Sequence, residues 1–164
     1  MSSSNVTLGV IADTHDNIRQ IRRAVNVFNQ RKVDLVIHAG DFVAPFALAP
    51  FEELKPKWVG VLGNNDGDRK SLIFASKGRI HYSPYDLIIA EYPIMVLHEL
   101  KPEIVREPFR LIVHGHTHAP EVAMSGQTLI LNPGECCGWI TGHSTIAVVE
   151  TATWEPEIID LPTG

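Results

Sequence analysis

The stretch TLGVIADTHDNIRQIRRAVNVFNQRKVDLVIHAGD, residues 7–41, decides the fold of this chain. It begins and ends with a short apolar run rich in Val, Ile and Leu, which is typical of a buried strand. Between the runs an apolar residue recurs every three or four positions, at Ile18, Ile21, Val25 and Phe28. This spacing predicts a helix with one apolar stripe, and Asn17 can cap its first turn. A strand, a helix and a second strand predict a right-handed βαβ unit.

Similar apolar runs follow at residues 58–63, 94–97 and 111–115, and each predicts another buried strand. The connections between them are less regular. Pro45 and Pro50 predict that any helix between residues 44 and 55 is short or starts late. Residues 68–76 predict a short helix, and residues 101–108 leave room for two turns at most.

The pattern changes near the C-terminus, where two hairpins are expected. The stretch EVAMSGQTLILNPG, residues 121–134, predicts one with its turn at Ser125 and Gly126. Residues 144–161 predict a second, turning near residues 151–154. The chain therefore predicts an α/β fold with parallel strands first and antiparallel strands last, packed as two sheets with helices outside.

Length and composition set the class of protein. A chain of 164 residues predicts a single domain, residues 1–164. A net charge of -5 with no long run of one sign argues against nucleic acid as the partner. Cys136 and Cys137 are adjacent, which disfavours a disulfide between them and fits a reducing compartment. No signal peptide or long apolar run is visible, so we expect a cytoplasmic protein without a membrane partner.

Polar side chains that can bind metal follow five of the predicted strands. They are Asp13, His15, Asp41, Asn64, His98, His116 and His118. Ligands of open α/β sheets bind where the carboxyl ends of the strands converge, so we expect these side chains to lie together. His38 is expected to pack behind them. If the strand stays extended through Gly115, the side chain of His114 points the same way as that of His116. We expect His114 at most to contact a ligand, and not to bind metal itself.

Imidazoles and carboxylates together suit zinc, manganese, iron and their neighbours. Seven donors are too many for one tetrahedral ion, and they suit two ions that share a bridging carboxylate. Asp41 is the expected bridge, because its strand neighbours the first strand in the βαβ unit. The sequence thus predicts a two-metal site.

In chain order, D-T-H, G-D, G-N-N-D, an isolated histidine and G-H-T-H resemble the motifs of the calcineurin-like metallophosphoesterases. The NPGECCG segment and the small size resemble the YfcE-like branch of small phosphodiesterases. The resemblance implies a four-layer αββα sandwich of two mixed β-sheets flanked by helices. It also implies a divalent-metal-dependent phosphodiesterase, in which a metal-bridging hydroxide at a two-metal centre hydrolyses the ester.

The resemblance also assigns the site residues. It places Asp13, His15 and His118 on one ion, Asn64, His98 and His116 on the second, and Asp41 between them. It makes Asn65 the catalytic residue that contacts the phosphoryl group. Mn²⁺ is the expected ion, with Ni²⁺, Fe²⁺, Zn²⁺ and Co²⁺ as alternatives.

Two departures from the family pattern bear on these assignments. Glu99 and Leu100 follow His98, where the family usually has glycine. Asn65 stands where many phosphomonoesterases of the superfamily carry histidine. An amide cannot protonate a leaving group, so we expect esters whose leaving groups need little acid help.

Three other functions stay open at this point. The same fold serves as a non-catalytic protein-interaction scaffold in the retromer, although that branch has lost ligands that this chain keeps. A phosphomonoesterase and a nuclease are the remaining alternatives. The expected partner is a small phosphoester substrate, and the apolar content of the short middle segments suggests a homodimer.

Overall fold

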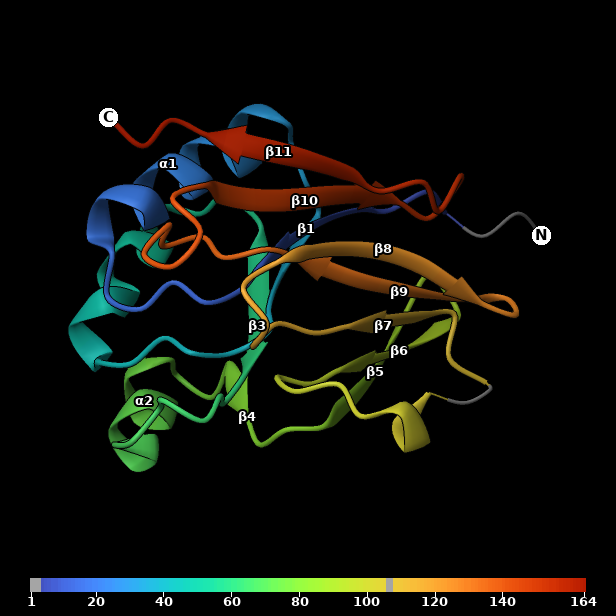
Figure 1. The fold of residues 1–164 in the computed structure, drawn as a ribbon, viewed down its shortest axis with the longest axis horizontal. Helices are drawn as coiled ribbons and strands as arrows, with labels where there is room; N and C mark the ends of the chain where they lie inside the picture. The colour runs from blue at the N-terminus through green and yellow to red at the C-terminus, as the bar shows by residue number, and fades with distance from the viewer. Residues whose placement is uncertain (1–3, 106–107) are drawn as a thin grey trace.

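The computed structural model describes residues 4–105 and 108–164 and consists of two mixed β-sheets that face each other (Figure 1). One has six strands in the order β11-β10-β1-β2-β3-β4 and the other five in the order β5-β6-β7-β9-β8. The strands of the first are β1 Thr7–Ile11, β2 Leu35–His38, β3 Lys57–Val61, β4 Ile80–His81, β10 Ser144–Glu150 and β11 Glu157–Leu161. Those of the second are β5 Tyr85–Ile89, β6 Tyr92–Val96, β7 Leu111–Val113, β8 Pro120–Ser125 and β9 Thr128–Pro133.

The predicted βαβ unit forms the centre of the first sheet. β1 and β2 pair in parallel, with Leu8 opposite Leu35, and α1 Ile18–Gln30 connects them. The side chain of Asn17 caps the helix by accepting a hydrogen bond from the backbone N–H of Gln20. The apolar stripe of α1 is buried against the sheet, and Phe28 is completely enclosed. The helix-period pattern of the sequence therefore identified both the element and its buried face.

The main core lies between the two sheets. Val10 and Ile37 from the first sheet join Leu111 and Val113 from the second in one buried cluster. α1, η1 Pro45–Glu53 and α2 Arg69–Ala75 cover the outer face of the first sheet. Among the described residues, the one helical element on the outer face of the second sheet is the short 3₁₀ helix η2 Pro102–Ile104, which packs near Met95 and its neighbours. The αββα sandwich is confirmed, with one helical layer reduced to this 3₁₀ helix.

Three local features differ from the expectation. The segment with two prolines is a 3₁₀ helix, η1 Pro45–Glu53, that starts at Pro45, because proline is tolerated in the first turn of a helix. The strands β4 and β5 were not expected; β5 is an edge strand whose alternation is obscured by the exposed Ile88. The predicted turn at Ser125 and Gly126 is wrong by one residue, since Ser125 pairs with Thr128 and the turn is made by residues 126–127.

The parallel strands bring several loops to one edge of the molecule. β1, β2 and β3 run in parallel in the first sheet, and β6 and β7 run in parallel in the second. The loops that follow these strands meet on the left of Figure 1. Within the described ranges, no helix has the length and apolar character needed to cross a membrane. The expected polar side chains all belong to the loops at this edge.

Candidate metal centre

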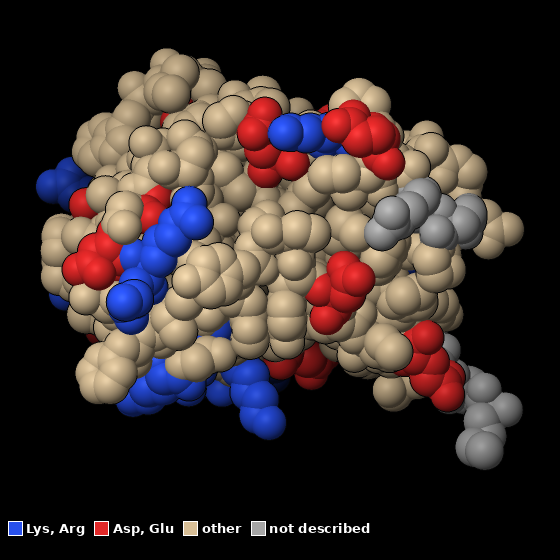
Figure 2. Space-filling model, turned by 90° about the horizontal axis from the view of Figure 1, so that it is seen from below, with Lys and Arg blue, Asp and Glu red and all other residues tan. Residues whose placement is uncertain are grey.

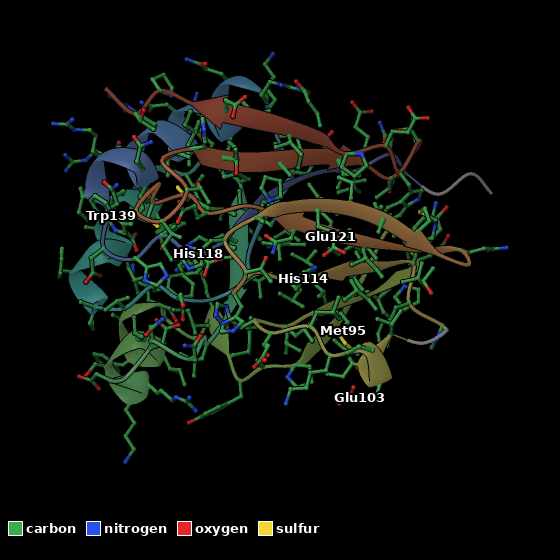
Figure 3. All side chains as sticks on the ribbon, in the orientation of Figure 1. Met95, Glu103, His114, His118, Glu121 and Trp139 are labelled. Carbon is green, nitrogen blue, oxygen red and sulfur yellow. The ribbon has the colours of Figure 1, made fainter. Side chains whose placement is uncertain are left out.

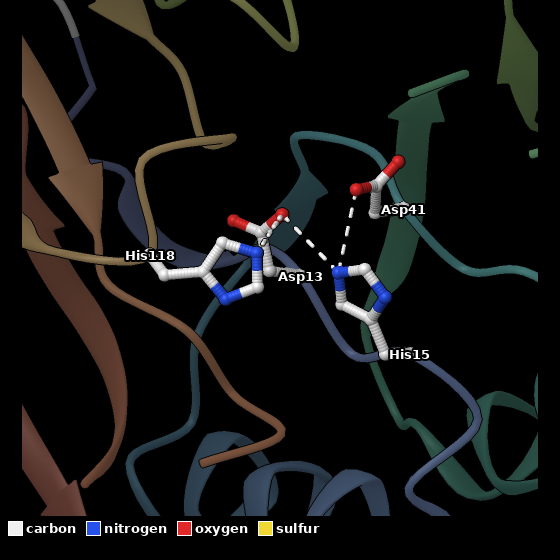
Figure 4. Close-up of side chains that lie close together, drawn as sticks. All are labelled: Asp13, His15, Asp41 and His118. Atoms are coloured by element: carbon white, nitrogen blue, oxygen red, sulfur yellow. Dashed lines mark ion pairs between the residues drawn. The ribbon is translucent and has the colours of Figure 1, made fainter. Parts of the chain in front are cut away.

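The structure brings the seven predicted ligands together. They come from the loops after β1, β2, β3, β6 and β7, which carry, in that order, Asp13 with His15, Asp41, Asn64, His98, and His116 with His118. Four of them, Asp13, His15, Asp41 and His118, place one donor atom each within 4.8 Å of all the others. Figure 4 shows these four side chains pointing toward one another.

One half of the centre is built around the carboxylate of Asp13. His15 Nε2 lies 3.7 Å from Asp13 Oδ1 and 3.3 Å from Asp41 Oδ2. His118 Nε2 approaches Asp13 Oδ1 from the other side at 3.6 Å. The second oxygen of Asp13 accepts a hydrogen bond from the backbone of His116 at 3.1 Å, which fixes the direction of the carboxylate.

The other half is built around the amide of Asn64. Its Oδ1 lies 2.8 Å from His98 Nε2 and 3.1 Å from His116 Nδ1. His98 Nε2 is also 3.3 Å from Asp41 Oδ2, so the same oxygen of Asp41 faces both halves. The Nδ1 of His98 lies 2.8 Å from the carbonyl of Ala39, which can only accept. Nδ1 therefore carries the hydrogen, and Nε2 is turned toward Asn64 and Asp41.

This donor set fits divalent cations. Asp13 Oδ1 and His15 Nε2 are buried and have no hydrogen-bond partner among the described residues. Buried polar atoms are rarely left unpaired unless an ion or a water satisfies them. Two ligand atoms on one tetrahedral ion, each at 2.0–2.1 Å from it, are roughly 3.3 Å apart. Several contacts in both halves are close to that separation.

The backbone of the site is strained. Five of the seven predicted ligands have a positive φ: Asp13, His15, Asp41, His116 and His118. Val43, two residues after Asp41, has a φ of 82°, a conformation that is unfavourable for a β-branched residue. Such strain persists only where the surroundings impose it, and it is concentrated at functional sites. The fold therefore holds these loops in conformations that their sequences alone do not favour.

Two glycines of the motifs make this packing feasible. Gly40 has a φ of 100°, and a Cβ there would lie 2.7 Å from His98 Nδ1. A Cβ on Gly63 would lie 2.2 Å from Asp41 Oδ1. The buried carboxylate of Asp66 then ties the loops together by accepting hydrogen bonds from the backbone N–H groups of Asp41, Val43 and Gly63.

The cluster of opposite charges shifts the pKa values of its members. The nearby carboxylates of Asp13 and Asp41 raise the pKa of His15 to about 9. Burial opposes ionisation of Asp41, but the contacts with His15 and His98 outweigh it and hold the pKa of Asp41 below its usual range. Burial likewise opposes protonation of His98, and the contact with Asp41 still raises its pKa. Without bound cations, protons on His15 and His98 would balance the negative charge of the same carboxylates.

Asn65 lies beside the centre but faces inward. Its backbone N–H donates to Asp41 Oδ1 at 2.9 Å and its Nδ2 to Asp41 Oδ2 at 2.8 Å. The amide group is therefore hydrogen-bonded to the predicted bridging carboxylate, and its contact with a substrate stays a prediction.

His114 lies elsewhere. It is on the opposite face of the second sheet, where its Nε2 contacts Glu121 Oε2 at 2.9 Å (Figure 3). The condition under which it would point with His116 is not met, because the chain leaves the extended conformation after Val113 and His116 has a φ of 70°. His38 does pack behind the site, stacked on Phe42 and bonded to Thr14 Oγ1 at 3.0 Å. Neither histidine contributes to the cluster.

Glu135 is the functional residue that the sequence reasoning missed. It is completely buried, and its Oε2 lies 2.5 Å from Nδ1 of His118. Its carboxylate also accepts hydrogen bonds from the backbone N–H groups of Ile140 and Thr141, from the Thr141 hydroxyl and from the Cys137 thiol. Burial opposes its ionisation, but these donors, His118 first, lower the pKa of Glu135 to about 2. A carboxylate on the far nitrogen of a ligating histidine fixes its tautomer and orientation.

The signal for Glu135 was present but weak. The residue lies in the NPGECCG segment, where no local spacing links it to His118. Cys136 and Cys137 beside it are free and buried, as their adjacency predicted. Burial raises the pKa of the Cys137 thiol to about 12, so it remains protonated and donates to Glu135.

Comparison with known proteins gives a consistent result. A family model described as the calcineurin-like phosphoesterase superfamily domain matches residues 6–153. A phosphodiesterase of Methanocaldococcus jannaschii is 34% identical over 153 residues, which cover 88% of this chain and 92% of the relative.

Solved structures agree with this match. The structure of an archaeal phosphodiesterase superposes with a TM-score of 0.88 at 32% identity, covering 94% of this chain and 99% of that one. The phosphoesterase YfcE from E. coli superposes with a TM-score of 0.70 at 15% identity, covering 95% and 100% of the two chains, and shows a shared fold.

The raised pKa of His15 predicts how the metal-free protein responds to pH. Protonated His15 stabilises the fold fully below its ordinary pKa of 6.5, and this contribution is lost as pH rises through about 9. In the presence of a chelator, we expect the melting temperature to fall between pH 6.5 and 9. His15→Gln should flatten the fall, and the exposed His143→Gln should not. A metal-free melting temperature that is constant over this range in the wild type would contradict the assignment.

The contact between Glu135 and His118 predicts an effect on metal affinity. Glu135→Gln should weaken Mn²⁺ binding by about 10- to 100-fold, because His118 loses the carboxylate that orients its ring. Equilibrium dialysis with metal analysis measures this directly. Thr141→Val is the matched control, since it removes a hydroxyl donor to Glu135 and leaves the His118 contact in place. Equal Mn²⁺ affinity in wild type and Glu135→Gln would show that the contact has no influence on the metal.

Proposed function

This chain belongs to the calcineurin-like phosphoesterase superfamily, and from that membership we propose that it is a divalent-metal-dependent phosphodiesterase with a two-metal centre. The observation that carries the proposal is the position of Asp41. Its Oδ2 lies 3.3 Å from the Nε2 atoms of both His15 and His98, which belong to the two halves of the site. A carboxylate oxygen placed between two imidazoles suits a bridge between two ions.

The chain's own residues divide into two sets around this bridge. Asp13, His15 and His118 would hold one ion, and Asn64, His98 and His116 would hold the other, each set completed by Asp41. Ions bound there would supply a hydroxide nucleophile near neutral pH and neutralise the charge that develops on the phosphoryl group. The filled positions in both sets favour an enzyme over a non-catalytic scaffold.

Asn65 links the centre to the choice of ester. Its side chain is exposed and hydrogen-bonded to Asp41, and we expect its Nδ2 to contact a phosphoryl oxygen of a bound ester. The amide can donate a hydrogen bond to that oxygen but cannot give a proton to a leaving group. This chemistry favours a diester with a good leaving group over a phosphomonoester that needs acid assistance.

The donor types are compatible with manganese, which we propose as the ion. The two sets consist of imidazole nitrogens and of carboxylate and amide oxygens, and no thiolate belongs to either set. Cys137 stays protonated and bound to Glu135. Thiolates select softer ions, whereas nitrogen and oxygen sets accept Mn²⁺, with Ni²⁺, Fe²⁺, Zn²⁺ and Co²⁺ as alternatives. The two free cysteines also fit a reducing, cytoplasmic compartment.

Asp41→Asn tests the proposal. The variant keeps the shape of the side chain but loses the negative charge between the two halves of the site. We expect the hydrolysis of bis(4-nitrophenyl) phosphate with Mn²⁺ to fall by about two to three orders of magnitude. The Mn²⁺ content after dialysis should fall as well.

Glu155→Gln, in the connection between β10 and β11, removes an exposed carboxylate that belongs to none of the loops of the site and serves as the control. Circular dichroism establishes that both variants are folded. Turnover by folded Asp41→Asn close to the wild-type rate would rule out the two-metal scheme.

A further inference from the structure

A cleft of about 340 Å³ opens directly beside the second half of the centre. Asn64 and His98 form its inner end. Its walls come from the start of α2, from the β4–β5 connection and from the segment between β6 and η2. The volume is in the range of small-molecule sites, which run from about 300 to 1,000 Å³. A substituent of an ester bound at the metal centre would extend into this space.

Two cations line the cleft. The Arg69 guanidinium is fixed through its Nε, which donates to the carbonyl of Asp66 at 3.3 Å, and its terminal nitrogens remain available. Lys101, just before η2, also lines the cleft. Within the part of the chain that is described, neither cation forms an ion pair. Glu99 is the one carboxylate of the lining, so the cations outnumber it by two to one.

Part of the remaining lining is aromatic or apolar. The Tyr82 side chain lines the cleft and is 61% exposed. Pro84 and Ile104 provide apolar surface nearby. The wall that carries Tyr82 is tied to the metal centre, because the Ser83 hydroxyl accepts a hydrogen bond from the backbone N–H of His98 at 3.2 Å. An exposed tyrosine on a fixed wall suits the stacking of a planar ring.

Figure 2 shows this side of the molecule from below. Most of the Lys and Arg atoms lie toward the left, where α2 is found in Figure 1, with acidic groups among them, and a further acidic group lies near the middle of the face. The chain as a whole carries a net charge of -5, so the two cations of the cleft lie on a molecule that is acidic overall. Cations that line a cleft raise the local concentration of an anionic ligand.

We propose that this cleft binds the substituent of the phosphodiester substrate, and that the substituent combines a planar ring with a second anionic group, as in a nucleoside bisphosphate. The metal centre binds the scissile phosphate, so the anionic group that contacts Arg69 and Lys101 is a second one on the same substrate. Tyr82 stacks on the ring between the two charges. This inference rests on the proposed function, because it assumes that a phosphoester occupies the metal centre.

Calorimetric titration of the Mn²⁺-loaded protein with two probes tests the inference. Thymidine 3′,5′-bisphosphate and thymidine 5′-monophosphate share the ring and differ in the second phosphate. We expect the bisphosphate to bind about tenfold more tightly, since it gains charged hydrogen bonds in the cleft. Arg69→Gln and Lys101→Gln should each reduce that difference, and the double variant should abolish it. Lys70→Gln, which removes the next cation of α2 from outside the cleft, should keep it.

Two variants of Tyr82 test whether its ring stacks on the ligand. Tyr82→Ala should weaken both probes by about fivefold or more, and Tyr82→Phe should preserve their affinities, because stacking needs the ring and not the hydroxyl. Equal affinities of the two probes for the wild type would overturn the proposal, as would a preference that survives in the double variant.

The binding assay is independent of turnover. A wild-type protein that prefers the bisphosphate but hydrolyses no diester would refute the proposed function and leave the cleft standing as an anion site. A wild-type protein that hydrolyses bis(4-nitrophenyl) phosphate but binds the two thymidine probes equally would refute the role proposed for the cleft and leave the proposed function intact.

Discussion

One oxygen of Asp41 lies between two imidazole nitrogens, and the rest of the site is arranged around this contact. Donor atoms that face one another in a buried place repel unless a cation or a proton lies between them. The raised pKa values of His15 and His98 indicate that protons can relieve this repulsion, and divalent ions can relieve it as well. The strained loops, the close-packed glycines and the buried Asp66 all hold that oxygen in place.

The two halves of the centre receive different support. His98 is held by a backbone carbonyl, whereas His118 is held by the charged Glu135. Glu135 in turn anchors the loop of residues 134–143, whose exposed Trp139 donates from Nε1 to the carbonyl of His15. The first half is thereby connected to the loop of residues 134–143 by hydrogen bonds, and the second half opens into the cleft. This asymmetry agrees with a centre in which one side is fixed and the other receives the substrate.

Much of this arrangement could be predicted from the sequence, because its signals are local. The stripe of α1 has helical spacing, and each predicted ligand follows an apolar run that ends in the same way. Glu135 and Asp66 could not be assigned, since their roles depend on contacts between loops that are distant in the chain. The direction of His114 could not be decided from the sequence, because parity holds only within an extended strand and the backbone changes conformation before His116. The edge strand β5 was missed because it is short and has an exposed isoleucine.

The number of ions held by the folded protein tests the two-metal scheme most directly. Protein reconstituted with Mn²⁺ and freed of excess ion would be analysed for metal content and by electron paramagnetic resonance. The account predicts two Mn²⁺ ions per chain with spectra of a spin-coupled pair, because Asp41 would bridge them. A single uncoupled Mn²⁺ ion per chain, bound at saturation, would contradict it.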